Sequence, residues 1–422
     1  MDISEQITGV LVVGLAVVGG LVMARFGLML LLSFLHARRV RRKDFSWGEP
    51  FTRPVTVLVP AYNERECIAA TVRSLVAGDH PIEVIVVDDG STDGTADIVD
   101  AMRLRDVRVV RRRNSGKPAA LNTGIAHARY DIIVMMDGDT VFEPSTVREL
   151  VQPFSDPRVG AVAGNAKVGN RDSLIGAWQH IEYVMGFNLD RRMYDMLRCM
   201  PTIPGAVGAF RRDALDRIGG MSEDTLAEDT DVTMALHRDG WRVVYAENAR
   251  AWTEAPETVQ QLWSQRYRWS YGTMQAIWKH RRAVVERGRR ADSGGWGCRS
   301  SRCSWSWPRC WRPHRCLPAV RARVRPDGKT VAAWFGVLLV QAVCAAYAFR
   351  LDKERMTHLI SLPLQQILYR QLMYVVLLQS WITALTGGRL RWQKLRRTGV
   401  VEAPGGTQNR RKAAEKDRRP VA

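Results

Sequence analysis

Hydrophobic and polar positions divide the chain into apolar segments near its two ends and a patterned central part. Residues 8–35 are almost wholly apolar and exceed the ~20 residues that a helix needs to cross a bilayer. Residues 331–349 form a second apolar segment, and residues 371–387 form a shorter third one. A cleaved signal peptide would carry positive charge before its apolar core, whereas here the charge follows it. We therefore predict transmembrane helices at both ends of the chain.

The central part alternates short β-branched runs with helical stretches. The runs lie at 55–59, 83–87, 107–110 and 131–136, and the helical stretches lie at 66–76, 95–102 and 118–128. Such alternation predicts βαβ units, and therefore an α/β domain with a mainly parallel sheet covered by helices. Ligands of such sheets gather at the carboxyl ends of the strands, so polar residues that follow the runs are candidate site residues.

The formal net charge of +19 would suit nucleic acid, a membrane surface or an anionic substrate. Much of this charge lies beside the apolar segments, at residues 36–43 and 389–397, as in cytoplasmic loops next to membrane spans. The sequence contains no helix-turn-helix, zinc-finger or aromatic RNA-binding signature, so we expect no nucleic-acid partner. The positive-inside rule places the N-terminus outside the cell and residues from 44 onward in the cytoplasm. The sequence thus predicts a multi-pass protein of the plasma membrane with a cytoplasmic catalytic domain.

These patterns divide the chain into six parts. They are an N-terminal transmembrane anchor at 1–36, a basic cytoplasmic linker at 37–53, an α/β catalytic domain at 54–285, a segment rich in Cys, Trp and Arg at 286–328, two transmembrane helix candidates at 329–390, and a basic, disordered cytoplasmic tail at 391–422. Of the seven cysteines, only Cys67 and Cys199 lie in the catalytic domain. This distribution is not that of a disulfide framework and favours a reducing compartment.

Residues 292–326 show neither a helical nor a strand period. They contain four of the seven cysteines, but only Cys298 and Cys303 have a C-x₄-C spacing, and no second such pair completes a zinc site. A second interpretation is that this stretch was translated out of frame, because runs of Trp, Cys, Arg and Ser arise when GC-rich codons for an apolar helix are read with a shift. In that case a membrane helix has been lost here.

Two pairs of acidic residues follow predicted strands. Asp137 and Asp139 come directly after one strand, where two carboxylates suit a hard divalent cation, Mg²⁺ or Mn²⁺, that also binds diphosphate oxygens. Asp88 and Asp89 follow another strand, where one of them would accept hydrogen bonds from the uracil or ribose of a nucleotide. The spacing does not decide between Asp88 and Asp89.

Three further groups are candidates for binding and catalysis. Lys117 lies at a predicted helix start, where its ammonium group and the free backbone N–H groups can both approach a phosphate. Glu228 and Asp229 begin another helical stretch, and a carboxylate in a cleft is a usual base for a sugar hydroxyl. In the motif QRYRW, Arg268 would neutralise a leaving diphosphate and Trp269 would offer a flat apolar face to an acceptor.

The chain resembles the processive, membrane-bound glycosyltransferases of family 2 in seven motifs that occur in the same order: PAYNE, VDDGSTD, SGKPAALN, DGD, GAVGAFRR, AEDTD and QRYRW. This group includes cellulose, chitin, hyaluronan and poly-N-acetylglucosamine synthases. The resemblance implies a GT-A fold with a Rossmann-like nucleotide-sugar domain. It also implies an inverting transfer, in which an acceptor hydroxyl displaces UDP from an α-linked donor and forms a β-linkage.

Carried over residue by residue, the resemblance assigns a role to each motif. The nucleotide would be held by Tyr62, Glu64, Asp88 or Asp89, and Lys117, and the metal and diphosphate would be held by Asp137 and Asp139. The catalytic base would be Asp229, next to Glu228. The leaving diphosphate and the acceptor end would be bound by Gln265, Arg268 and Trp269, and the stretch from Gly205 to Arg211 would border the acceptor site.

The match also departs from the group, because processive members thread their product through several membrane helices and this chain shows about three candidates. We expect a transferase that uses a UDP-sugar donor, UDP-N-acetylglucosamine, and a growing β-linked polysaccharide as carbohydrate acceptor. It would work at the lipid bilayer, and an accessory export subunit is a possible partner. Two alternatives remain open. One is a single-sugar transferase acting on a lipid carrier, against which the QRYRW motif argues. The other is a membrane protein left inactive by the segment after Arg290, against which the intact acidic motifs argue.

Overall fold

The computed structural model of the protein describes residues 3–42, 44–284, 328–386, 399 and 401. Within these residues the central domain contains one eight-stranded sheet with the strand order β3-β2-β1-β4-β7-β6-β8-β5. The strands are β1 (Val55–Ala61), β2 (Ile82–Asp88), β3 (Val107–Arg111), β4 (Ile132–Met135), β5 (Val141–Phe142), β6 (Val159–Val168), β7 (Gly208–Arg211) and β8 (Arg242–Thr253).

The sheet is mainly parallel, as the sequence pattern predicts. Strand β1 pairs in parallel with β2 and β4, β2 pairs in parallel with β3, and β6 pairs in parallel with β8. Strand β7 runs antiparallel between β4 and β6, and β5 runs antiparallel to β8. The carboxyl ends of β1, β2 and β4 therefore lie along one edge of the sheet, and the polar motifs follow these strands.

Helices cover both faces of the sheet. They are α2 (Ile68–Val76), α3 (Thr95–Ala101), α4 (Lys117–His127), α5 (Thr146–Val151) with the 3-10 turn η1 (Gln152–Ser155), α6 (Leu174–Val184), the π-helical turn η2 (Met185–Leu189), α7 (Asp190–Leu197), α8 (Arg212–Ile218), α9 (Glu228–Arg238) and α10 (Val259–Lys279), which the 3-10 turn η3 (Arg281–Val284) follows.

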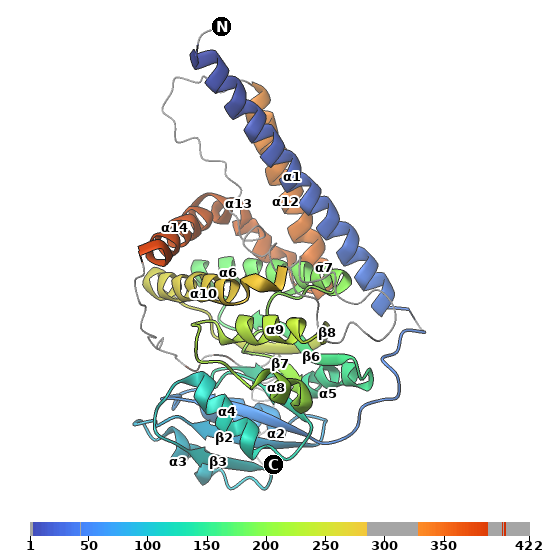
Figure 1. Cartoon of the computed structure of the whole chain (residues 1–422), viewed down its shortest axis with the longest axis vertical. Coiled ribbons are helices and arrows are strands. Elements are labelled where there is room, and N and C mark those ends of the chain that lie inside the picture. Colours follow the sequence, from blue (N-terminus) through green and yellow to red (C-terminus); the bar gives the residue numbers. More distant parts are fainter. Residues whose placement is uncertain (1–2, 43, 285–327, 387–398, 400, 402–422) are drawn as a thin grey trace, which may run out of the picture.

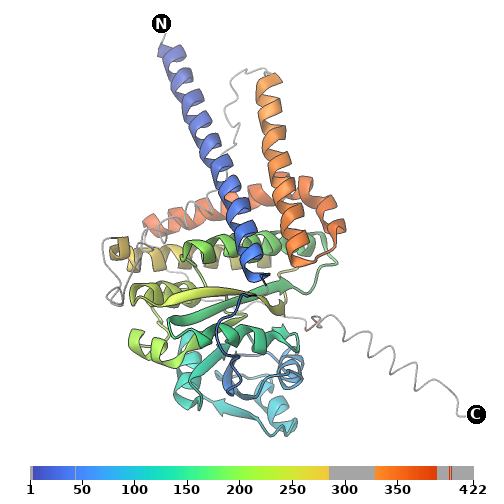
Figure 2. The same cartoon turned by 90° about the vertical axis from the view of Figure 1, so that its right-hand side faces the viewer.

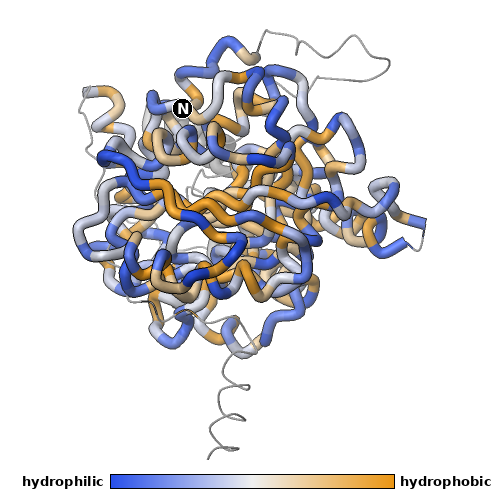
Figure 3. Tube along the Cα trace, turned by 90° about the horizontal axis from the view of Figure 1, so that it is seen from below, coloured by the Kyte–Doolittle hydropathy of each residue, from blue (hydrophilic) through white to orange (hydrophobic). Residues whose placement is uncertain are grey.

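Successive residues of the central strands face opposite sides of the sheet, and both sides are buried. Leu58 packs into the core on the α4 face, whereas Val57 and Val59 pack into the core on the α2 face. This explains why the strands read as uninterrupted apolar runs and not as alternating ones. Figure 3 shows the apolar strands running through the centre of the molecule.

Two long helices extend away from the central domain. Helices α1 (Ile3–Val40) and α12 (Gly328–Asp352) contact each other and rise together beyond the rest of the molecule (Figures 1 and 2). Their segments Val17–Val40 and Phe335–Asp352 are long and apolar enough to cross a membrane. They correspond to the first two predicted spans, and many of their large apolar side chains are exposed.

The third predicted span is arranged differently. Residues 371–387 overlap α14 (Arg370–Thr386), which is not one of the two helices among the described residues that are long and apolar enough to cross a membrane. It packs against α10 and lies crosswise to α1 and α12 (Figures 1 and 2). It is preceded by η6 (Met356–Ser361), α13 (Leu362–Leu364) and the π-helical turn η7 (Gln365–Tyr369). The predicted anomalous segment at 286–328, apart from Gly328, and the predicted tail at 391–422, apart from 399 and 401, lie outside the described residues.

We predict that replacing Leu58 by Ala lowers the free energy of unfolding by about 2–5 kcal/mol. The side chain is fully buried in β1, and a Cβ atom on Gly124 of α4 would lie only 3.0 Å from it, so the helix is packed closely against this leucine. Thermal unfolding of the detergent-purified chain measures the change. Val76→Ala, at the exposed end of α2, is the control and should change stability by less than about 0.5 kcal/mol. An equal loss in both variants would contradict this account of the core.

Candidate active site

One lysine joins three polar segments at the carboxyl edge of the sheet. The ammonium nitrogen of Lys117, the first residue of α4, lies 2.7 Å from Oδ1 of Asp137, on the loop after β4. The same nitrogen lies 2.8 Å from Oε1 of Glu228, the first residue of α9. Burial opposes the charge of Lys117, but the two carboxylates hold its pKa above the usual range of a lysine. The structure thus brings together residues that the sequence placed in three separate motifs.

Gly205 lies directly against this cluster. A Cβ atom on Gly205 would lie 2.6 Å from Nζ of Lys117 and 3.5 Å from Oδ1 of Asp137. Any side chain here would therefore displace the lysine from its carboxylate partners. The sequence placed Gly205 at the border of the acceptor site, and the structure places it beside Lys117 and Asp137.

Glu228 and Asp229 are neighbours whose pKa values are shifted in opposite directions. Burial would raise the pKa of Glu228, but Lys117 reverses this and holds that pKa below its ordinary value. Burial raises the pKa of Asp229 to about 6, and the charge of Glu228 adds to the rise. Lys117 counteracts the rise only in part. At neutral pH Asp229 is therefore an ionised carboxylate that takes up a proton readily, which is what a general base requires.

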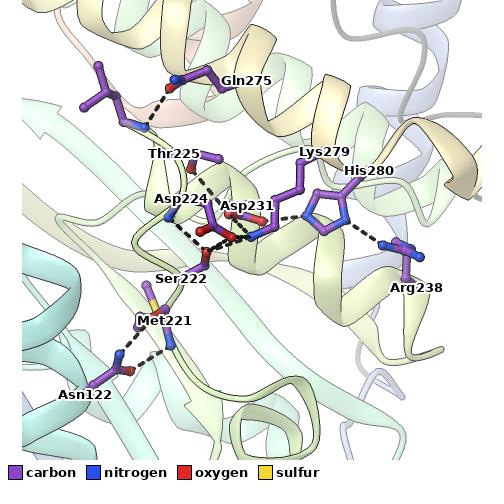
Figure 4. A network of polar contacts seen from close by, with 11 residues as sticks. Asn122, Met221, Ser222, Asp224, Thr225, Asp231, Arg238, Gln275, Lys279 and His280 are labelled. Atoms are coloured by element: carbon purple, nitrogen blue, oxygen red, sulfur yellow. Dashed lines mark hydrogen bonds and ion pairs between the residues drawn. The ribbon is translucent and has the colours of Figure 1, made fainter. Parts of the chain in front are cut away.

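A polar network fixes the helix that carries Asp229 (Figure 4). Asp231 of α9 accepts hydrogen bonds from Nζ of Lys279 at 2.8 Å and Nε2 of His280 at 2.6 Å, at the end of α10. The other ring nitrogen of His280 lies 3.2 Å from the guanidinium of Arg238. Burial would raise the pKa of Asp231, but His280 and Lys279 lower it, so the residue stays charged. The network therefore holds α9 and α10 in a fixed relation.

Asp88 and Asp89 have different surroundings. Both oxygens of Asp89 accept hydrogen bonds from the backbone of the segment before α4, from N–H of Ser115 at 3.1 and 3.2 Å and from N–H of Gly116 at 2.7 Å. Oδ2 of Asp88 accepts a hydrogen bond from N–H of Ser91 at 3.3 Å. Its Oδ1 is buried and accepts no hydrogen bond from any residue that the structure describes. Of these two aspartates, Asp88 is therefore the one with a buried acceptor oxygen available to a ligand.

Asp137 and Asp139 lie on either side of Gly138, after β4, and Asp139 is buried. A Cβ atom on Gly138 would lie 3.0 Å from Cγ of Glu64, so Glu64 adjoins this loop. Within the described ranges no three His, Cys, Asp or Glu residues form a ready metal cage. Carboxylate oxygens are nevertheless the donors that Mg²⁺ and Mn²⁺ prefer, and Mg²⁺ is commonly held by one or two carboxylates with water and substrate phosphates. The two aspartates offer the donor chemistry of a cation site of that kind.

A cavity of ≈ 250 Å³ adjoins the acidic cluster. Its lining residues come from α1, α6, η2, α7, the loop after α7, α10 and the segment from η7 to α14. Pro201 and Thr202 line this cavity, whereas the next residues, up to Gly205, line the small pocket beside Lys117, Glu228 and Asp229. The cavity and the small pocket therefore share one short stretch of chain, residues 201–205, in their walls.

Three residues of α10, Gln265, Arg268 and Trp269, were predicted to bind the leaving diphosphate and the acceptor end. The side chain of Gln265 is buried, and its Oε1 has no hydrogen-bond partner among the described residues. Arg268 interacts electrostatically with Glu228. Trp269 lines the cavity. Tyr62 follows β1 at the same edge of the sheet as Asp88.

Arg211 is not brought to this site, which corrects the assignment made from the sequence. Strand β7 is antiparallel to β4, and Arg211 pairs with Ile132, at the end of β4 opposite to Asp137. Its guanidinium donates to the backbone carbonyls of Phe154 at 3.0 Å and Val159 at 3.2 Å. Arg211 therefore fixes the chain around η1 and β6.

Several cavity residues were not identified from the sequence. Arg191 of α7 is buried, lines the cavity and interacts electrostatically with Asp229, and burial lowers its pKa to about 10. Glu182 of α6 and Tyr369 of η7 line the cavity and bind the buried Arg266. Of these residues, Arg266 is the one that the sequence could have indicated, because it belongs to the QRYRW motif. The others lie in helices without a recognisable motif.

The chain is similar in sequence to curated bacterial polysaccharide synthases. The chain is 34% identical over 222 residues to the poly-beta-1,6-N-acetyl-D-glucosamine synthase of Staphylococcus aureus (strain COL) and, over the same length, 34% identical to the synthase of that description from Staphylococcus epidermidis. Each match covers 52% of this chain and 54% of the relative. The chain thus spans about half the length of the curated relatives that it matches.

A solved structure shows the same fold. The mannosyltransferase from Pyrobaculum calidifontis in complex with GDP-Man and Mn²⁺ has a TM-score of 0.56 with this chain at 23% identity, and the match covers 89% of this chain and 99% of that chain. The sequence profile described as "Glycosyltransferase like family 2" matches residues 52–272, which contain every residue of the acidic cluster. Because this match extends over more than half of the chain, the protein belongs to glycosyltransferase family 2 and its central domain is a glycosyltransferase domain of the GT-A type.

Proposed function

We propose that the chain transfers a sugar from a UDP-sugar, UDP-N-acetylglucosamine, with inversion, to a growing β-linked polysaccharide at the cytoplasmic face of the plasma membrane. The observation that carries the proposal is the cluster of Lys117, Asp137, Glu228 and Asp229 beside a cavity of ≈ 250 Å³. It combines groups for a diphosphate with a general base and leaves room for an acceptor. The similarity to poly-beta-1,6-N-acetyl-D-glucosamine synthases supports the donor and the polymeric product.

Asp88 is assigned to the nucleotide in preference to Asp89. Its buried Oδ1 can accept a hydrogen bond from uracil or ribose, whereas both oxygens of Asp89 already hold the backbone before α4. A buried acceptor without a partner costs free energy, so a ligand that supplies a donor there binds favourably. Tyr62 and Glu64, on the loop after β1, adjoin this part of the site.

The diphosphate is assigned to Asp137, Asp139 and Lys117. Mg²⁺ or Mn²⁺ held by the two aspartates would neutralise diphosphate charge and so favour departure of UDP. Lys117 adds a positive charge at the start of α4, where free backbone N–H groups also face an anion. A bound diphosphate would join Asp137 and Glu228 as a further partner of the lysine.

Asp229 is assigned as the general base. Its carboxylate takes the proton of the acceptor hydroxyl while the hydroxyl oxygen forms a bond to the anomeric carbon of the donor. The bond from that carbon to the UDP oxygen breaks, and its electron pair leaves with UDP. Glu228 stays ionised through Lys117 and keeps Lys117 in place. Gln265 and Arg268 are assigned to the leaving diphosphate, and Trp269 to the acceptor end.

The membrane parts are proposals of the same kind. We assign α1 and α12 as spans that anchor a cytoplasmic domain, with the basic residues after α1 on the cytoplasmic side. The exposed apolar side chains of both helices support contact with lipid. Secretion of a polymer would need further membrane elements, which an accessory subunit can supply.

Membranes that contain the chain should release UDP from UDP-N-acetylglucosamine in the presence of Mg²⁺ or Mn²⁺. Asp229→Asn should lower this rate by about 10²- to 10⁴-fold, because the amide cannot take up the proton. UDP release and product length, by gel filtration, are measured together. Asp239→Asn, at the other end of α9 in an ion pair with Arg217, is the matched control and should keep full activity. Silence with every UDP-sugar would refute the proposal, and products extended by one sugar would indicate transfer to a lipid carrier.

The rate of UDP release should rise with pH through about pH 6. Asp229, with its pKa of about 6, is protonated below this pH and then cannot accept the acceptor proton. Its charged neighbours are Glu228 and Asp137, which raise this pKa, and Lys117, which lowers it; Arg191 also lies within electrostatic reach. A pH–rate profile at saturating donor tests the assignment. A rate that stays constant from pH 7 to pH 5 would exclude Asp229 as the base.

Asp88→Asn and Asp89→Asn should have separable effects. The first should weaken UDP binding by about tenfold or more, with little change in melting temperature, because it alters an acceptor that no described residue uses. The second should lower the melting temperature, because it weakens the charge-assisted hydrogen bonds to Ser115 and Gly116. Titration calorimetry with UDP and thermal unfolding give both values. The reverse pattern would show that the two roles are exchanged.

A further inference from the structure

A fully buried arginine lies behind one wall of the cavity. Arg266 of α10 places NH2 2.7 Å from Oε2 of Glu182 on α6, and the same nitrogen donates to the hydroxyl of Tyr369 on η7 at 3.4 Å. The Tyr369 hydroxyl donates in turn to Oε2 of Glu182 at 2.5 Å. Arg266, Glu182 and Tyr369 therefore form a closed triad that joins three helical elements.

The same guanidinium also supports Trp269. The Cζ atom of Arg266 lies 4.3 Å from the centre of the Trp269 ring, one helical turn further along α10. This distance is that of a cation–π contact, which is strong where water is excluded. Glu182, Tyr369 and Trp269 all line the cavity, whereas Arg266 lies behind them. One buried side chain thus fixes three residues of the cavity wall.

These three residues have the chemistry of a saccharide site. A carboxylate and a phenol hydroxyl can bind sugar hydroxyls, and an indole offers a flat apolar face to the C–H groups of a sugar ring. Glu182 keeps 25% of its side chain exposed, so it is accessible from the cavity. The wall is therefore polar at Glu182 and Tyr369 and apolar at Trp269.

We propose that Arg266 is a positioning residue that holds Glu182, Tyr369 and Trp269 as one wall of an acceptor site, and that Glu182 and Tyr369 bind hydroxyl groups of the acceptor saccharide. This inference rests on the proposed function, because it requires that the acceptor be a carbohydrate. Tyr369 lies beyond residues 52–272, the range that matches the family. The segment after α12 thus completes the acceptor site of the glycosyltransferase domain.

Two conservative variants and one control test the proposal in the full-length chain. Tyr369→Phe removes only the hydroxyl, and Arg266→Lys keeps the charge but loses the planar group that stacks on Trp269. The control is Tyr267→Phe, because the Tyr267 hydroxyl also bonds to the C-terminal helix, at 2.6 Å from Oγ1 of Thr383, but Tyr267 does not line the cavity. All three variants thus act on α10 or on its contact with the C-terminal segment.

The measurements are the KM for an added N-acetylglucosamine oligosaccharide, the ratio of sugar transfer to donor hydrolysis, and the Kd for UDP. Tyr369→Phe and Arg266→Lys should each raise the acceptor KM by about three- to tenfold and lower the ratio of transfer to hydrolysis, with the Kd for UDP unchanged. Tyr267→Phe should leave all three values unchanged.

The outcomes separate this inference from the proposed function. If the wild-type chain releases UDP but Tyr369→Phe keeps the wild-type KM and transfer ratio, the inference is wrong while the proposed function stands. If the wild-type chain releases UDP from no UDP-sugar, the proposed function itself fails. Should Arg266→Lys not fold, the isosteric Tyr369→Phe alone decides. A fall in melting temperature without a change in acceptor KM would show that the triad is only structural.

Discussion

The arrangement of the site depends on one ammonium group. Lys117 begins α4, Asp137 follows β4 and Glu228 begins α9, and two ion pairs of 2.7 and 2.8 Å join these distant segments. Without the positive charge, the two carboxylates and the adjacent Asp229 would repel one another where water is scarce. The lysine therefore allows a cleft to hold enough negative charge for a cation and for proton transfer while keeping one shape.

The same ion pair gives two adjacent carboxylates different properties. Lys117 keeps Glu228 ionised, and the charge of Glu228 then contributes to the raised pKa of Asp229. Titratable neighbours whose pKa values are pushed apart are a common sign of distinct acid and base roles. A base with a pKa near the working pH takes up and releases protons efficiently. In the proposed reaction, binding of a diphosphate and activation of a hydroxyl are thus linked through Lys117.

Strands β1 to β4 could be predicted because each is a run of mainly apolar residues, and β1, β2 and β4 are buried on both faces. Strands β5 to β8 were not predicted, because their sequences mix apolar with polar or small residues. Asp88, Asp89, Asp137 and Asp139 were candidates because they follow such runs, whereas Glu228 and Asp229 were candidates because they begin a helical stretch. Asp88 and Asp89 could not be told apart, because they differ in long-range hydrogen bonds: the backbone N–H groups of Ser115 and Gly116 donate to Asp89. Arg211 was misplaced because a motif read along the chain does not show that β7 runs antiparallel to β4.

Helix α14 shows why the C-terminal segment could not be assigned from composition. Its exposed residues Val375, Leu378, Trp381 and Leu385 recur every three to four positions, while Met373 and Leu377 line the cavity. The helix is apolar both on its exposed face and on the face that lines the cavity, and such a sequence resembles that of a membrane span. Its contact with α10 places Tyr369 beside Arg266. The cavity is therefore shared between the family-matched domain and the C-terminal helices, so the proposed acceptor site requires that α14 be docked on α10.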